Sequence, residues 1–204
     1  MIRVFTLLDA LFLENFEYDY KELVANQNLE SSFEFVILNL NVKSENLTTL
    51  SNYKNLNIVE FYGESLFNYI YENTQEVAFF LMPHLIYELP NFLNKIDLCK
   101  DQILLRKNVH SKNLERVMSC IKDKSFYNKL FKEIKDCSIF SDSYFGTTLY
   151  SSDLIYGTKS FYKSLCDTFK DINDSQILVK DSHYKFDLIL NLTLLQNKFY
   201  VNSV

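Results

Sequence analysis

The chain is 204 residues long, 48% hydrophobic and 16% aromatic, and its formal net charge is −5. This length and apolar content suffice to bury one substantial core, so we expect residues 1–204 to form a single domain. Only three glycines are present, which argues against the glycine-rich loops that cradle phosphates. Lysine and arginine form no basic stripe, so we expect no nucleic-acid partner.

The cysteines and the N-terminal residues indicate where in the cell the protein is expected. Cys99, Cys120, Cys137 and Cys166 match no zinc-binding spacing, and we expect reduced, mostly buried thiols in a cytoplasmic protein. The first nine residues carry one positive side chain and lack the pattern of a signal peptide. No apolar run approaches the length of a membrane span. We therefore expect no transmembrane segment, although peripheral contact with a membrane is compatible with the sequence.

In the first half of the chain, strand-like and helix-like segments alternate. Short apolar runs predict strands over residues 2–8, 33–39, 57–62 and 77–82, and the intervening periodicity predicts helices over 15–28, 44–54 and 64–73. Strands that are almost continuously apolar, separated by helices, indicate parallel βαβ units covered on both faces.

The second half is less regular. The periodicity predicts helices over residues 88–98, 113–134, 160–170 and 187–197, and an edge strand over 199–202. Residues 138–152 are rich in aromatic and β-branched side chains and predict one or two strands joined by a turn at Gly146. Gly157 is also expected in a turn. The charged segment over residues 100–112 is interpreted as a solvated helix or loop.

The run from Val77 to His84 is the most informative stretch for function. It is apolar and strand-like, and it ends abruptly on Met82, Pro83 and His84. Ligands of open α/β sheets bind beyond the carboxyl ends of the strands, so His84 would reach a binding crevice if this strand is central. His84 could ligate a metal ion, donate a hydrogen bond to a phosphate, or cap the following helix.

The order of these segments resembles the nucleotide-diphospho-sugar transferase superfamily, the glycosyltransferases of the GT-A fold. The stretches that carry the resemblance are Val4–Asp9, Phe35–Asn39, Asn57–Phe61, Val77–His84, Tyr144–Tyr150, Gly157–Tyr162 and Phe186–Asn191. The resemblance implies an α/β, GT-A-like (Rossmann-like) domain with a mixed, mostly parallel sheet flanked by helices. It also implies a nucleotide-binding half over residues 1–84 and an acceptor-side half over 85–204.

The same resemblance suggests where substrates would bind. Leu8 and Asp9 end the first strand and Asn39 ends the second, so we expect them to contact substrate. Tyr144 and Gly146 would belong to the acceptor side. Arg106 would bind substrate through the charge of a diphosphate. Asp9 could equally be a turn acid, and most aromatic side chains must be core.

Two carboxylates are candidate catalytic groups. Asp142 precedes the turn at Gly146 and could accept a proton from an attacking hydroxyl, although it could also be a surface acid. Asp187 stands in the segment that resembles Asp-Gln-x-x-Leu-Asn, where the family has Gln, and Phe186 stands where it has Asp. Asp187 also lies four residues after His183, so an ordinary ion pair on one helix face is an alternative.

The sequence departs from the family at the metal site. Most GT-A enzymes hold Mn²⁺ or Mg²⁺ with an Asp-x-Asp motif, whereas this chain has Met82, Pro83 and His84 there. These cations prefer oxygen ligands, so a single imidazole is a weak substitute, and the cofactor stays undetermined, with His84 as the candidate metal ligand.

Three functions are compatible with the sequence. The first is a glycosyltransferase, or a divergent glycosyltransferase-like protein, that uses a nucleotide-sugar donor and a glycan acceptor in surface glycan assembly. The second is a non-catalytic interaction or scaffold protein that keeps the fold, as the missing acidic motif would suggest. The third, an unrelated doubly wound nucleotide-binding enzyme, is disfavoured because the first turn lacks glycine.

Overall fold

The computed structural model describes residues 1–26, 33–62, 65–94, 96, 102–107, 150–174, 182–197, 199 and 201–203. The predicted helix over 113–134 lies outside the described residues, as do the candidate residues Asp142, Tyr144 and Gly146 and most of the strand region predicted over 138–152.

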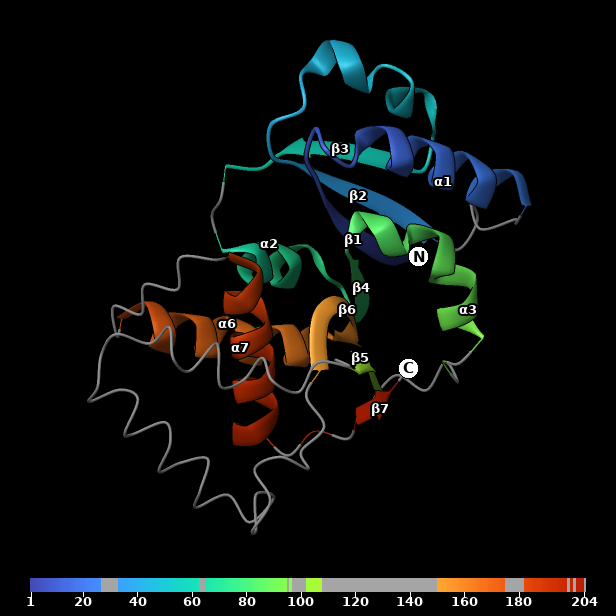
Figure 1. Cartoon of the computed structure of the whole chain (residues 1–204). Helices are drawn as coiled ribbons and strands as arrows, with labels where there is room; N and C mark the ends of the chain where they lie inside the picture. The colour runs from blue at the N-terminus through green and yellow to red at the C-terminus, as the bar shows by residue number, and fades with distance from the viewer. Residues whose placement is uncertain are drawn as a thin grey trace.

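Within the described residues, one seven-stranded sheet has the order β3-β2-β1-β4-β6-β5-β7 (Figure 1). Its strands are β1 (Ile2–Leu8), β2 (Phe33–Asn39), β3 (Leu56–Glu60), β4 (Val77–Leu81), β5 (Ile103–Lys107), β6 (Tyr150–Thr158) and β7 (Val201–Ser203). Strands β1 to β4 pair in parallel, and so do β5 and β7. Only β6 is reversed, and it pairs antiparallel with both β4 and β5. The predicted α/β fold with a mixed, mostly parallel sheet is confirmed.

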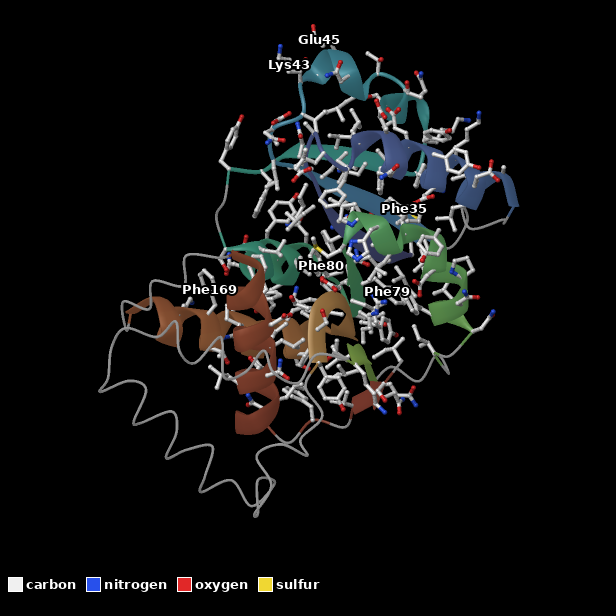
Figure 2. The ribbon with its side chains drawn as sticks, viewed as in Figure 1. Phe35, Lys43, Glu45, Phe79, Phe80 and Phe169 are labelled. Carbon is white, nitrogen blue, oxygen red and sulfur yellow. The ribbon has the colours of Figure 1, made fainter. Side chains whose placement is uncertain are left out.

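Helices cover both faces of the sheet (Figure 1). One face packs against α1 (Leu13–Asn26), the short 3-10 helices η2 (Ser44–Leu47), η3 (Leu50–Asn52) and η4 (Pro83–Glu88), and α3 (Leu89–Leu93). The other face packs against α2 (Leu66–Asn73), α6 (Lys159–Asp174) and α7 (Ser182–Gln196). Successive strand residues alternate between these cores: Phe79 joins the α1 side and Phe80 the α2 side (Figure 2).

The prediction of one helix over residues 44–54 is wrong. Two 3-10 turns occur there instead, η2 and η3. Polar side chains compete for the backbone: the Thr48 hydroxyl donates to the Glu45 carbonyl at 3.3 Å, and the Ser51 hydroxyl donates to the Leu47 carbonyl at 2.9 Å. Such local bonds favour turns over a continuous α-helix. Leu47 and Leu50 are nevertheless buried, as their spacing indicated.

Two strands of the second half differ from the sequence prediction. Residues 103–107 form β5, although the surrounding charges suggested a solvated helix or loop. Its Ile103-Leu104-Leu105 core is buried between β6 and β7. Strand β6 continues to Thr158, so Gly157 lies inside a strand and not in a turn. The helix predicted over 88–98 is divided between the end of η4 and α3. The predicted edge strand is confirmed as β7.

Gly157 permits a close approach between β6 and α6. A Cβ atom at this position would lie 2.6 Å from Cδ1 of Phe161, whose ring is fully buried. No real Cβ contact is that short, so either the ring or the helix would have to move. The requirement for glycine here is therefore steric.

We expect Gly157→Ala to lower the free energy of unfolding by about 1–3 kcal/mol, because it overpacks this contact. Urea denaturation checks the value, with Ser164→Ala at a partly exposed position on α6 as a control that should stay within about 0.5 kcal/mol of the native protein. Adding Phe161→Leu to Gly157→Ala should cost less than the sum of the two single changes. Simple additivity of the two substitutions would contradict the steric explanation.

Burial also controls the thiol of Cys166 on α6. Desolvation, with a smaller contribution from the charge of Asp167, raises the pKa of Cys166 to about 11. We therefore expect native protein at pH 8 to resist alkylation of Cys166 by iodoacetamide, and urea-unfolded protein to react, as peptide mapping would reveal. The stabilisation linked to this thiol is present below pH 9 and is lost as the pH rises towards 11. Rapid alkylation in the native state would contradict the burial.

Candidate functional site

The carboxyl ends of the parallel strands meet at one edge of the sheet. The final residues of the first three strands are in register: Leu8 pairs with Asn39, and Asn39 pairs with Glu60. Strand β4 ends beside β1, and the reversed strand β6 begins at the same edge, where Leu154 faces Leu81. Open α/β sheets bind their ligands at this edge, so it is the candidate site.

Two of the predicted substrate-binding residues lie at the end of β1: Leu8 is its last residue, and Asp9 follows it. The Leu8 side chain is fully buried, and its carbonyl accepts a hydrogen bond from the Leu40 amide at 2.9 Å. One carboxylate oxygen of Asp9 accepts from the amides of Leu11 and Phe12, at 2.8 and 3.3 Å. Asp9 thus shapes the turn that leads into α1. Its carboxylate is only partly buried, so a role in binding remains a prediction.

Asn39 is almost fully buried at the end of β2. Its side-chain amide donates to the Val42 carbonyl at 2.8 Å and to Oε1 of Glu60 at 2.9 Å, and its carbonyl oxygen accepts from the Val42 amide at 2.8 Å. These bonds close the turn after β2 and connect it to the end of β3. Both N–H groups of the Asn39 carboxamide are thus used, so a substrate that accepted from them would have to displace one of these bonds.

Two polar side chains of α7 hold the start of β6. Oδ1 of Asp187 accepts from the Ser152 amide at 2.6 Å. Asn191, one turn later, accepts from the Tyr150 amide at 3.0 Å and donates to the Tyr150 carbonyl at 2.9 Å. Asp187 and Asn191 are only 7% and 8% exposed. The candidate catalytic residue Asp187 therefore lies beside the carboxyl edge, where it also supports the backbone of β6.

Asp153 is a second carboxylate at this edge, and the sequence analysis missed it. Its carbonyl accepts from the Met82 amide at 2.8 Å, so it lies directly beside the end of β4. Asp153 and Asp187 both adjoin Ser152, one along the chain and one through a hydrogen bond. The available signal was the polar Ser151-Ser152-Asp153 run entering the apolar Leu154–Tyr156 run.

His84 lies on the α1 side of the sheet, whereas Asp187 comes from α7 on the other side. The imidazole is exposed, and η4, which carries it, packs against α1. Together with Pro83 it lines a hollow of about 220 Å³ beside α1. The rings of His84 and Phe12 face each other across 6.5 Å between centroids.

The residues at the end of β4 do not fit an Mn²⁺ or Mg²⁺ site. Met82 and Pro83 offer no oxygen side chain, and His84 offers one nitrogen, whereas these ions require several oxygen ligands. In the part of the chain that the structure describes, no three His, Cys, Asp or Glu side chains are grouped to hold a metal ion. Charge at this edge is therefore assigned to side chains and not to a metal ion.

Arg106 extends from β5, beside Ser151 of β6. The charge of Arg106 affects the pKa of the Tyr87 hydroxyl on η4. Hydrogen bonding to Glu88 raises the pKa of Tyr87, the Arg106 charge opposes that rise, and the Asp19 charge adds to it. Arg106 and Asp19 thus exert opposite electrostatic effects on η4.

No family model and no curated protein matches the sequence significantly. Solved structures do match. The bifunctional glycosyltransferase WbbM in its apo form has a TM-score of 0.56 at 11% identity, over 100% of this chain and 38% of the WbbM chain. The glycosyltransferase GlyE of Streptococcus pneumoniae TIGR4 has a TM-score of 0.52 at 12% identity, over 100% of this chain and 45% of its own. This chain has a glycosyltransferase-like fold.

A third glycosyltransferase-like structure adds detail. The galactosyltransferase LgtC, solved with donor and acceptor sugar analogs, has a TM-score of 0.51 at 11% identity, over 100% of this chain and 73% of LgtC. The chain spans less than half the length of WbbM and GlyE. At these identities the similarity establishes the architecture. Among the helices that the structure describes, none has the length and apolar character needed to cross a membrane.

The contact between α7 and β6 can be tested by substitution. We expect Asp187→Ala to lower the free energy of unfolding by about 1–3 kcal/mol, because it leaves the buried Ser152 amide without its acceptor. Asp187→Asn keeps an acceptor oxygen and should cost less. Asn68→Ala, which removes an exposed side-chain bond on α2, is the control for urea denaturation. If Asp187→Ala unfolds like the native protein, this contact does not support the start of β6.

Proposed function

We propose that the protein is a glycosyltransferase, or a divergent glycosyltransferase-like protein, that binds a nucleotide-sugar donor and a glycan acceptor in surface glycan assembly. The observation that carries this proposal is the similarity of the whole chain to WbbM, GlyE and LgtC. The complex of LgtC with donor and acceptor sugar analogs supports sugar ligands here. Residues 1–84 form the donor half and residues 85–204 the acceptor half, and the reduced, buried Cys166 is in keeping with a cytoplasmic location.

The donor binds beyond the carboxyl ends of β1 to β4. Asp9 and the backbone after β1 contact the nucleotide, and the sugar lies near Ser152, Asp153 and Asp187. Ligands of α/β sheets bind at this edge, which supports that placement. The backbone hydrogen bond from Met82 to Asp153 puts Asp153 next to the residues that stand where the Asp-x-Asp motif would be, which supports a role for its carboxylate.

Transfer joins an acceptor hydroxyl oxygen to the anomeric carbon as the bond from that carbon to the diphosphate breaks. A carboxylate within hydrogen-bond reach accepts the hydroxyl proton, which is the role proposed for Asp142 or Asp187. The negative charge on the departing diphosphate needs a cation. Arg106 is proposed for that role because the end of β4 provides no carboxylate ligands for a metal.

A non-catalytic scaffold is the second candidate. Hydrogen bonds within the protein favour it: the polar groups of Asn39 are engaged by Val42 and Glu60, and Asp187 supports the backbone of β6. A protein that kept the fold and lost the chemistry would retain such structural bonds.

We expect one nucleotide sugar among UDP-glucose, UDP-galactose, UDP-N-acetylglucosamine and GDP-mannose to stabilise the protein. When the nucleotide sugar is present at a hundredfold excess over its dissociation constant, binding raises the free energy of unfolding by about 2.7 kcal/mol. This stabilisation is measured as a rise in melting temperature. The rise should be equal with Mn²⁺ or with EDTA. It should fall in Asp153→Ala, in which the carboxylate is lost, and persist in Lys163→Gln, which changes an exposed cation on α6.

Release of nucleoside diphosphate in the presence of an acceptor then separates enzyme from scaffold. Stabilisation of the protein by a donor, together with release of nucleoside diphosphate, supports a transferase. Stabilisation without release on any glycan acceptor tested supports a protein that has lost the reaction. Failure of all four donors at millimolar concentration would contradict donor binding altogether.

A further inference from the structure

The hollow between α1 and η4 lies on the α1 side of the sheet, whereas α7 packs on the other side. Its volume is about 220 Å³. Phe12, Asn15, Tyr18 and Asp19 line it from the start of α1, and Pro83 and His84 line it from η4. The buried ring of Phe16, stacked on Tyr20 at 5.8 Å, forms its floor. Because η4 packs against α1, the two walls belong to one packed unit.

The lining combines flat apolar surfaces with polar groups at their margin. The ring of Tyr18 is 67% exposed, and the tilted rings of Phe12 and His84 form a second surface. The carboxamide of Asn15, the carboxylate of Asp19 and the imidazole of His84 offer hydrogen-bond donors and acceptors. Partial burial raises the pKa of Asp19, so this carboxylate is already withdrawn in part from water.

The chemistry of the hollow excludes several ligands. The carboxylate of Asp19 lines the hollow and makes it unfavourable for a phosphate or another anion. Its volume is below the roughly 300–1,000 Å³ of typical drug-sized sites, so a whole nucleotide does not fit. Asp19 and His84 alone are too few to hold a metal ion, and no larger group of metal ligands occurs among the described residues.

A sugar ring matches this lining. Its C–H faces pack on aromatic rings, and its hydroxyls both donate and accept hydrogen bonds around the rim. We propose that the hollow between α1 and η4 is a binding subsite for one neutral monosaccharide unit. Sugar binding in this hollow does not depend on the proposed function, whereas a role as an anchor for a sugar of the acceptor chain rests on it.

The test is saturation-transfer NMR on the full chain with galactose, glucose and N-acetylglucosamine as the probes. We expect saturable transfer from at least one of them at millimolar concentration. Tyr18→Ala and Asp19→Asn should each weaken that binding at least tenfold. Tyr62→Ala removes an aromatic ring that is 86% exposed after β3, outside the hollow, and should bind as the native protein does. Circular dichroism of each variant verifies folding, which these exposed or partly exposed positions should not disturb.

Absence of saturable transfer from all three sugars would overturn the subsite, and so would equal binding by the native protein, Tyr18→Ala and Asp19→Asn. The nucleotide-sugar melting assay, repeated on Tyr18→Ala, keeps the two proposals apart. An unchanged donor response with lost monosaccharide binding is the expected result. Monosaccharide binding without any donor response would leave the subsite in place and contradict the proposed donor site.

Discussion

The reversed strand β6 depends on side chains of α7, and the arrangement of the candidate site depends on β6. Beyond the end of β4, the first residues of β6 have β5 as their neighbouring strand, and the pairing with β5 shifts register between Leu105 and Arg106. Asp187 and Asn191 bond to Ser152 and Tyr150 from a buried position. An unpaired buried amide or carbonyl costs about 1–3 kcal/mol, so these contacts stabilise the start of β6 at the carboxyl edge. They also fix Asp153 beside Met82.

The first half of the fold was predictable because parallel strands covered on both faces are uninterrupted apolar runs. β5 was not, because its buried core is three residues long and is flanked by charges. The extent of β6 was misjudged because Gly157 suggested a turn, although its role is to admit the ring of Phe161. The pattern of residues indicates the local preference of a segment. Both β5 and β6 instead depend on pairing with segments that are distant in the chain.

Part of the candidate site was predictable because the apolar runs show where the strands end. Strand ends identified the edge where Asp9, Asn39 and Met82 lie, and the family resemblance identified Asp187. Asp153 was missed because its position follows from pairing with β4, which the sequence does not display. The face occupied by His84 was equally hidden, since the packing of η4 on α1 decides it. The polar residues near the sheet thus separate into one group beside α7 and another beside α1.

The sheet order has a consequence for synthesis on the ribosome. Strand β4 is central in the finished sheet, yet its neighbour β6 lies about seventy residues further along the chain. Until β6 is translated, β4 has a hydrogen-bonded partner on one side only, and its strongly apolar strand is an open edge of a half-built sheet. The nascent chain therefore passes through a stage in which the backbone N–H and C=O groups on one side of β4 can pair with other chains, and a chaperone that covers this edge would lower that risk.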